Sequence, residues 1–354
     1  MHLKHIYWFA YYNEDEPSVR YRCIYPLRYL AETHDITYSI VHPGYDRKHI
    51  AAFIRIYLSA LIFRKKNSLI VFQKIFTGGI YAHALKLLLF FRPTFTLYDT
   101  DDAEHTRRTT DTIHHFMKHC SACSAGSRSL IQYISPLNPN AFLLTSPVID
   151  HGVIKREREN IFTIGWIGYY GAHLESLETL LFPALTQIPF PVRFIVLGAR
   201  NEGEAEHIIS SFKKYDHISV EAPLNISWLD ERSVYHQIAR FDVGVSPLLD
   251  TEFNRGKSAF KLKQCLSCGI PVLGSSVGEN KYFLQEGVNG YFCDSPKEYL
   301  ERIIAIRNAP LSDYMTMSKE AAASSRLFSM EHFSASLLAI TENLPIDHPL
   351  DQTL

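Results

Sequence analysis

The sequence Arg255-Gly-Lys-Ser-Ala-Phe-Lys-Leu-Lys-Gln264, which runs into Cys268-Gly-Ile-Pro-Val-Leu-Gly274, decides the fold of this chain. The first stretch predicts a short helix that begins with basic residues, and the second predicts a glycine stop followed by a buried strand. This order places lysines at the N-terminus of a helix that faces a crevice at the end of a strand. Such crevices are where α/β proteins hold phosphorylated ligands.

Length and composition limit the class of protein. The chain has 354 residues, which is long for a single core and favours two domains. Its 36 Lys and Arg nearly balance 37 Asp and Glu, whereas a nucleic-acid-binding protein is usually basic. Six cysteines are few for this length, and residues 1–9 run into a strand-like segment instead of a signal peptide. We therefore expect a reduced, cytoplasmic protein that binds no nucleic acid.

Short apolar runs alternate with helical patterns along the whole chain. This alternation predicts parallel sheets covered by helices on both faces. We expect a first domain over residues 1–150, a second over 151–330, and a helix with a tail over 331–354, with a charged linker at 155–159. The expected strands are 6–10, 37–41, 69–73, 95–98, 119–124 and 142–144, then 161–167, 192–197, 218–221, 243–245 and 270–273.

Two apolar stretches, 50–66 and 82–92, carry basic residues at their edges. The first contains Arg55 and ends in Arg64-Lys-Lys66, and the second contains Lys86 and ends in Arg92. Neither provides the roughly 20 apolar residues that a membrane span needs. One interpretation is a pair of buried helices. The other is a pair of helices that rests on an anionic leaflet at the inner face of the cell membrane.

Two segments are candidates for binding a phosphate. Gly165-Trp-Ile-Gly168-Tyr-Tyr-Gly171 follows an expected strand and opens an expected helix, so its backbone can approach a phosphate, although a plain tight turn has the same pattern. Lys257 and Lys261 are four residues apart, which predicts that they share one helix face beside Arg255. A solvated lysine face is the alternative. Gln264 lies one turn beyond Lys261, within reach of a ribose hydroxyl.

Three carboxylates, those of Asp99, Asp101 and Asp102, end an expected strand in the first domain. They suit a metal ion, an acceptor hydroxyl or the capping of the next helix, and the sequence leaves these alternatives open. His105 follows within one helical turn and suits a general base, a polar contact or a purely structural role.

Two Cys-x-x-Cys pairs raise the question of a zinc site. Cys120 and Cys123 lie on an expected strand, where side chains three residues apart face opposite ways. Cys265 and Cys268 lie on an expected helix in the other domain. Because an all-cysteine zinc site would need both pairs together, we expect buried free cysteines and no metal.

The segment from Arg255 to Val272 resembles the C-terminal signature of the retaining GT-B glycosyltransferases of family 4, the group 1 transferases. Further segments resemble segments of this family and follow one another in the same order, so that the resemblance covers nearly the whole chain. These segments are Ser18-Val-Arg-Tyr-Arg22 in the first strand-to-helix loop, Tyr98-Asp-Thr-Asp-Asp102, Ile164-Gly-Trp-Ile-Gly168, Phe241-Asp-Val-Gly-Val-Ser-Pro-Leu248 and Gly287-Val-Asn-Gly-Tyr-Phe292. The segments at 18–22 and 98–102 resemble one bacterial subgroup of the family.

The resemblance implies an α/β chain with two Rossmann-like domains facing a cleft, whose last helix crosses back to the N-terminal domain. It implies sugar transfer with retention, from a nucleotide sugar on the C-terminal domain to a glycan or lipid-linked acceptor on the N-terminal one. The expected donor is a UDP-sugar or GDP-sugar, and the expected role is cell-surface polysaccharide or glycoconjugate synthesis. No cofactor or divalent metal is expected to be required.

The resemblance also implies roles for individual residues. The expected catalytic residues are Lys257, Lys261, Asp102 and His105. The expected donor-binding residues are Gly168, Tyr169, Arg255, Gln264, Ser276, Gly278, Glu279 and Asn280. The expected acceptor-side residues are Arg20, Arg22 and Asp101. Lysines beside a helix N-terminus would stabilise the negative charge that develops on a departing nucleoside diphosphate.

The chain departs from the family's pattern at one place. The usual pair of glutamates, eight positions apart, falls here on Gly256 and Gln264, so both carboxylates are missing. Glu279 is the expected substitute for the contact with the sugar. The glutamine form recurs in the subgroup that the chain resembles, which favours activity. A nucleotide-sugar epimerase of the same architecture and a non-catalytic subunit that binds sugar nucleotides are the alternatives.

Overall fold

The computed structural model describes residues 3–44, 46–62, 67–91, 94–155 and 161–342. Several predictions concern residues outside these ranges. They are most of the linker at 155–159, the basic residues at 64–66 and 92, and the tail from 343 to 354.

The described residues form two compact units. The first contains residues up to 147, the short segment 255–258, and the chain from 328 onward. The second contains 148–254 and 259–327. The domain limits expected at 150 and 330, and the roles expected for the two domains, stay predictions.

The first unit is built on a parallel six-stranded sheet with the order β2-β1-β3-β4-β5-β6. The chain passes from β1 to β2 and then returns to β3 on the other side of β1. The direction of connection therefore reverses between β1 and β3, and ligands of such sheets bind beyond the carboxyl ends of the strands at this switch point. The strands are β1 (His5–Ala10), β2 (Thr37–Val41), β3 (Ser68–Gln73), β4 (Phe95–Thr100), β5 (Ala122–Ala125) and β6 (Ala141–Leu143).

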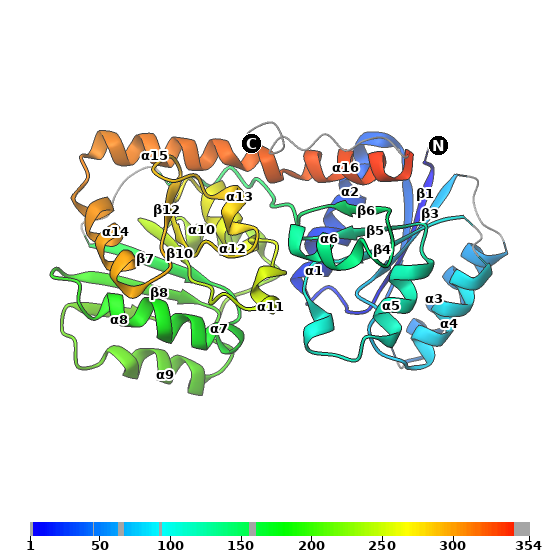
Figure 1. Cartoon of the computed structure of the whole chain (residues 1–354), viewed down its shortest axis with the longest axis horizontal. Coiled ribbons are helices and arrows are strands. Elements are labelled where there is room, and N and C mark those ends of the chain that lie inside the picture. Colours follow the sequence, from blue (N-terminus) through cyan, green and yellow to red (C-terminus); the bar gives the residue numbers. More distant parts are fainter. Residues whose placement is uncertain (1–2, 45, 63–66, 92–93, 156–160, 343–354) are drawn as a thin grey trace. The chain divides into compact units, whose positions relative to one another are not determined.

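Helices surround this sheet, and β1 and β3 are buried at every residue, as expected for strands covered on both faces. The last described helix, α16, packs on α2 (Figure 1), and its Phe333 and Leu337 join the core that contains Trp8 and Leu27. The last helix thus returns to the first unit, as predicted. The helices are α1 (Pro17–Val19), a π-helical turn (Arg20–Ile24), α2 (Tyr25–His34), α3 (Arg47–Leu61), α4 (Ile80–Phe91), α5 (Asp111–His119), α6 (Arg128–Ile134) and α16 (Met330–Glu342).

The second unit repeats this plan with the strand order β12-β11-β10-β7-β8-β9, again all parallel. Its switch point lies between β7 and β10, because the chain builds outward from β7 to β9 and then restarts at β10. The strands are β7 (Phe162–Ile167), β8 (Val192–Leu197), β9 (Ile218–Glu221), β10 (Val243–Ser246), β11 (Val272–Gly274) and β12 (Gly290–Phe292).

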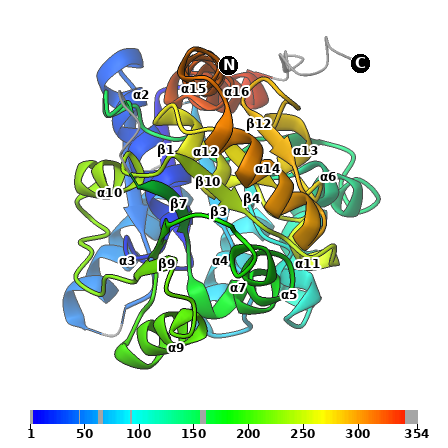
Figure 2. The same ribbon diagram turned by 90° about the vertical axis from the view of Figure 1, so that its left-hand side faces the viewer.

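The helices of the second unit pack on this sheet around a core that includes Phe162, Trp166 and Leu181. α9 lies against β9, the strand at one edge of the sheet (Figure 2). The helices are α7 (Tyr170–Ser176), a π-helical turn (Leu177–Leu181), α8 (Phe182–Leu185), α9 (Glu202–Phe212), α10 (Glu231–Ile238), α11 (Glu252–Arg255), α12 (Phe260–Ser267), α13 (Asn280–Phe283), α14 (Pro296–Asn308) and α15 (Leu311–Ala323).

The lysine-rich segment is not one helix. α11 ends at Arg255 and α12 begins only at Phe260, and Ala259 between them has left-handed backbone with φ 55°. A residue in that conformation cannot continue a right-handed helix. The prediction that Lys257 and Lys261 share a helix face is therefore wrong, although Lys261 does lie in the first turn of α12.

Other local predictions also differ from the structure. Residues 18–22, expected in a loop, are helical, because Pro17 stands in the first turn of α1 and has the backbone angle that a helix start requires. Cys120 follows α5 instead of lying in a strand, and Cys268 follows the end of α12. All six cysteines are buried and free. Helices α5, α9 and α15 were not expected, although Asn201, whose side chain caps α9, is a recognisable start signal.

Candidate functional site

Lys261 lies beside the bend that follows β7 in the second unit. Its ammonium lies 2.7 Å from Nε2 of His173 and 5.7 Å from the centre of the Trp166 ring. Because an ammonium group only donates hydrogen bonds, His173 accepts through Nε2 and carries its proton on Nδ1. Trp166 belongs to β7 and His173 to α7, so the strand and the helix that flank the bend hold the lysine between them.

Gly168 makes this close approach possible. Its φ is +147°, and a Cβ atom added there would lie 2.0 Å from Cε of Lys261. Gly198, which follows β8, is equally constrained, since its Cβ would lie 1.5 Å from the carbonyl oxygen of Gly168. The two glycines bring the ends of β7 and β8 together beside the switch point of the sheet. Lys261 therefore supplies positive charge where this fold favours an anionic ligand.

Tyr169 and Arg200 add to this edge of the sheet. Tyr169 is exposed, and the guanidinium carbon of Arg200 lies 3.6 Å from the centre of its ring. A planar guanidinium can donate two parallel hydrogen bonds to a phosphate. Arg200 was missed in the sequence because a single arginine in a polar loop has no distinguishing pattern. The signal that could have found it is its place three residues after the end of a buried strand and two after Gly198.

Some backbone donors expected to contact a ligand are engaged within the protein. The N–H of Gly168 donates to the carbonyl of Leu197 at 2.9 Å, and the N–H of Ser276 donates to Asp294 at 2.7 Å. The Ser276 hydroxyl also donates to Asp294. These hydrogen bonds fix the shapes of the two loops in the described structure.

The remaining candidates of the second unit lie mostly below its surface. Gln264, Glu279 and Asn280 are buried. The Asn280 amide donates to the carbonyls of Ser246 and Ser275 at 3.3 and 3.1 Å, which ties the end of β10 to the end of β11. Gly278 turns the same loop with φ +57°. Arg255, which belongs to the segment of the first unit, is exposed at the end of α11.

A buried lysine lies at the switch point of the first sheet. Lys74 directly follows β3, has left-handed backbone with φ 54°, and has a side chain only 3% exposed. Its ammonium lies 3.1 Å from Asp101 and 2.8 Å from Asp102. Burial by itself would lower the pKa of Lys74, but the two aspartates raise it well above its usual range. Lys74 is therefore a permanent cation, and it was not singled out in the sequence.

Asp102 is the more exposed aspartate of this pair. Its side chain is 26% exposed, whereas Asp101 is nearly buried and accepts a hydrogen bond from the Ser18 hydroxyl at 2.7 Å. Lys257, in the segment that belongs to the first unit, has its ammonium 3.7 Å from Asp102. The structure thus brings Asp101 and Asp102 to Lys74, and Lys257 to Asp102.

The two arginines predicted on the acceptor side have structural contacts. Arg22 is fully buried and donates to both carboxylate oxygens of Asp99 and to the carbonyl of Leu144. Arg20 donates to the carbonyls of Glu14 and Asp15 at 2.7 and 3.0 Å. Arg22 therefore joins the ends of β4 and β6, and Arg20 fixes the loop after β1.

The first unit also contains His105 and the strand-end carboxylates for which a metal ion was one alternative. The His105 ring stacks on Tyr133, with 3.6 Å between ring centres and 10° between planes. The strand-end carboxylates pair with Arg22 and Lys74. Among the residues that the structure describes, no three His, Cys, Asp or Glu side chains come together as a metal site requires.

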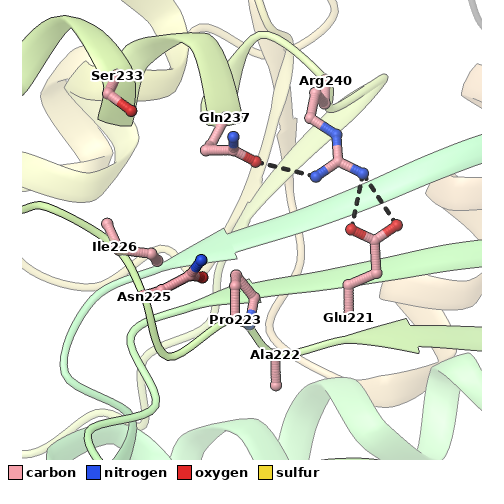
Figure 3. A pocket seen from close by; sticks show the side chains of 8 residues that line it. All are labelled: Glu221, Ala222, Pro223, Asn225, Ile226, Ser233, Gln237 and Arg240. Carbon is pink, nitrogen blue, oxygen red and sulfur yellow. Dashed lines mark hydrogen bonds and ion pairs between the residues drawn. The ribbon is translucent and has the colours of Figure 1, made fainter.

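A hollow of about 540 Å³ lies elsewhere in the second unit, between β9 and α10 (Figure 3). Three of its polar side chains bond to one another: Arg240 donates to both oxygens of Glu221 at 2.9 and 2.7 Å and to Gln237 at 2.9 Å. Neither the bend at Gly168 nor Lys261 lines it.

Comparison with known proteins agrees with this architecture. Residues 161–308 match the family described as Glycosyl transferases group 1. Sucrose-phosphate synthase from Thermosynechococcus elongatus aligns with a TM-score of 0.70 at 12% identity, over 96% of this chain and 98% of that one. HepE from Anabaena, solved in complex with UDP, aligns with a TM-score of 0.66 at 13% identity, over 96% of this chain and 100% of that one. No curated protein sequence matches the chain.

A third similar structure is a glycosyltransferase from Rickettsia africae, with a TM-score of 0.66 at 12% identity over 96% of this chain and 98% of that one. At such low identity, structural likeness shows the fold, which here is the pair of Rossmann-like domains of GT-B proteins. The matched segment, which contains the bend at Gly168 and Lys261, supports a group 1 glycosyltransferase.

Proposed function

We propose that this protein transfers a hexose-type sugar from a nucleotide sugar to a glycan or lipid-linked acceptor, with retention. The observation that carries this proposal is the placing of Lys261 by His173 and Gly168 at the switch point of the second sheet. The proposed donor is a UDP-sugar or a GDP-sugar. HepE, solved with UDP and with UDP-glucose, favours uridine.

Lys261 would act on the leaving group. Departure of a nucleoside diphosphate leaves negative charge on its terminal phosphate oxygens. Lys261 lies in the first turn of α12, so its ammonium and the N-terminal N–H groups of that helix can act on the same oxygens. Arg200 is proposed to add a planar donor, Gln264 to contact the ribose, and Glu279 to contact the sugar. Positive side chains supply the charge in this scheme, and no cofactor is part of the proposal.

Asp102 is proposed to orient the acceptor hydroxyl, with His105 as a further polar contact. Lys74 would hold the Asp102 carboxylate in place, and Arg20, Arg22 and Asp101 would act as positioning residues beneath it. We place the reaction on the cytoplasmic side of the cell membrane, in the synthesis of cell-surface polysaccharide or glycoconjugate.

The first test is a thermal-shift screen with UDP, GDP, ADP, CMP and dTDP and their common sugar conjugates. A ligand that binds only the folded protein raises the unfolding midpoint by mass action. We expect a shift with one nucleotide, UDP or GDP, and a further shift with its sugar conjugate. The absence of any shift would contradict a nucleotide-sugar site in the isolated protein.

Incubation with the bound donor separates the alternatives. A transferase hydrolyses its donor slowly and consumes it when an acceptor is added, whereas an epimerase converts the donor without an acceptor. A non-catalytic subunit binds the nucleotide and transfers nothing to any acceptor of a broad panel.

Lys257→Ala tests the first lysine of the signature, which is also proposed to act in transfer. We expect it to lower transfer by about 100-fold, as loss of a donor to developing negative charge does elsewhere. Because the Lys257 side chain is partly exposed, the unfolding midpoint should barely change. Lys213→Ala, at an exposed lysine after α9, is the matched control and should keep wild-type turnover. Wild-type turnover in Lys257→Ala would remove Lys257 from the reaction.

A further inference from the structure

Large apolar side chains are exposed along α3 and α4 in the first unit. They are Ile50, Ile54 and Leu58 on α3, and Ile80, Leu87 and Phe90 on α4, which we call the α3–α4 face. Together with Ile62 and Phe91, they are eight of the seventeen large hydrophobic side chains that are exposed in the described part of the chain. Single exposed apolar residues are ordinary, but such a concentration on two helices marks an interaction surface.

The spacing of these residues puts them on one side of each helix. Ile50, Ile54 and Leu58 are four residues apart, and on α4 the exposed positions are seven and three apart, which follows the helical repeat. The opposite sides of the helices, including Ile56 and Leu85, are buried.

The topology places α3 and α4, with their exposed apolar side chains, on the same face of the sheet. α3 leads from β2 to β3 and α4 from β3 to β4, and both steps run the same way along the sheet. Right-handed crossovers therefore place both helices on one face of the sheet. The helices lie side by side in Figure 1, and the Phe53 and Tyr81 rings meet between them with 5.3 Å between centres. The exposed stripes thus form one continuous surface.

This surface is basic in a nearly neutral chain. The sequences of 47–62 and 80–91 contain Arg47, Lys48, Arg55 and Lys86 but no Asp or Glu, and the nearest carboxylate along the chain is that of Asp46, which caps α3. Apolar side chains beside lysines and arginines are typical of helices that lie in the plane of an anionic membrane.

We propose that the α3–α4 face docks on the surface of an anionic lipid bilayer, with both helices lying in the plane of the interface. None of the described helices is long and apolar enough to cross a membrane. A second copy of the chain fits this face less well, because a symmetric dimer would bring the basic residues of both copies together. Docking on a bilayer does not depend on the proposed function. Its purpose does, because that purpose is to bring a lipid-linked acceptor to the enzyme.

The test is sedimentation of the full chain with vesicles. One set contains phosphatidylglycerol mixed with phosphatidylcholine, and the other contains phosphatidylcholine alone. We expect the wild type to sediment with the anionic vesicles, less with the neutral ones, and less as salt increases. The double variant Ile54→Ser/Phe90→Ser should lose about tenfold or more of its vesicle partitioning, because it removes two apolar contacts. Arg55→Glu should weaken binding to the anionic vesicles only.

The matched control is Ile209→Ser/Leu311→Ser, which removes two similarly exposed apolar side chains from α9 and α15 in the second unit. It should sediment like the wild type. Equal sedimentation of the two double variants, or no binding of the wild type to anionic vesicles, would overturn the proposal. So would a wild type that is dimeric without lipid and becomes monomeric in Ile54→Ser/Phe90→Ser, since the face would then be a dimer interface.

The nucleotide-induced thermal shift, measured on the same preparations, separates this proposal from the proposed function. A retained shift without vesicle binding contradicts only the membrane proposal. Vesicle binding without any nucleotide shift leaves the membrane proposal standing and contradicts the nucleotide-sugar site. A retained shift in the double variant also shows that its second unit is folded.

Discussion

Lys74 shows how a single buried charge organises the ends of the first sheet. It touches Asp101 and Asp102 while its own side chain is almost completely removed from water. Removing one partner of a buried ion pair leaves an uncompensated charge, whereas removing an exposed partner costs little. Lys74 and Lys257 both approach Asp102, but only Lys74 is deeply buried, so the two lysines should differ sharply in what they contribute to stability.

We expect Lys74→Met to lower the free energy of unfolding by about 3–5 kcal/mol. Lys257→Met, at the partly exposed lysine beside the same carboxylate, should lower it by less than about 1 kcal/mol. Urea denaturation of both variants measures the difference. Equal losses would mean that the burial of Lys74 does not decide its contribution.

The raised pKa of Lys74 also determines how its contribution to the free energy of unfolding depends on pH. Because its pKa is higher in the folded than in the unfolded chain, its contribution is complete below the unfolded value of about 10.4 and is lost as pH rises through the folded value. The stability difference between wild type and Lys74→Met should therefore be constant from pH 7 to about 9 and shrink above about 10.5. Urea titrations at several pH values measure it, and a difference that shrinks below pH 9 would contradict this account.

At the scale of elements, the bend between β7 and α7 is defined by its contact with α12. Gly168 has positive φ, and the Lys261 side chain occupies the place that a Cβ atom would need. The bend, the helix that carries Lys261, and the histidine that binds it therefore form one local arrangement. A methyl group at position 168 must push Lys261 aside or distort the bend.

We expect Gly168→Ala to weaken binding of the nucleotide found in the screen by about tenfold or more, because Lys261 loses its position. Backbone strain at this φ should also lower stability by about 1–3 kcal/mol. Gly203→Ala, in the first turn of α9, is the control, since an alanine Cβ there meets only the Asn201 side chain at 3.3 Å. Calorimetric titration measures both affinities. Unchanged affinity in Gly168→Ala would show that the position of Lys261 does not matter for binding.

At the scale of the whole molecule, the chain leaves the first unit, builds the second, and then returns. α16 completes the core of the first unit with Phe333, Leu337 and Ile340. The Arg22 guanidinium also lies 5.5 Å from the centre of the Phe333 ring, so the return helix contacts the residue that joins the strand ends. The stability of the first unit therefore depends on residues more than three hundred positions away from its first strand.

Leu337→Ala should lower the stability of the first unit by about 2–5 kcal/mol, the usual cost of a cavity at a fully buried leucine. Leu338→Ala, at the half-buried neighbour, should cost clearly less. Trp8 lies in the first core, whereas Trp166 and Trp228 lie in the second unit. Fluorescence of Trp8 in a Trp166→Phe/Trp228→Phe background can therefore follow the first unit. Unchanged unfolding of Trp8 in Leu337→Ala would contradict the role of α16 in this core.

The sequence by itself determined most of the strands and the fold class. Runs such as Thr37–Val41, Val192–Leu197 and Ile218–Glu221 coincide with strands, because β-branched and apolar residues in short runs report local conformation and burial directly. The signature around Lys261 also indicated the glycine and the strand that follow α12, but only the later part of the predicted helix, since α12 begins at Phe260. These features are local, so a local pattern contains them.

Only the tertiary structure decided which side chains meet. Lys74 follows β3 and Asp101 follows β4, and they come together because these strands are neighbours in the sheet. Arg22 was predicted on the acceptor side from its place in the chain, and only the structure shows that it is buried and joins Asp99 of β4 to the Leu144 carbonyl after β6. Ala259 interrupts the predicted lysine-rich helix because its φ is 55°, a left-handed value that an alanine in the sequence does not predict. Strand order and backbone angles set these contacts, and both depend on residues far apart in the chain, which local patterns do not record.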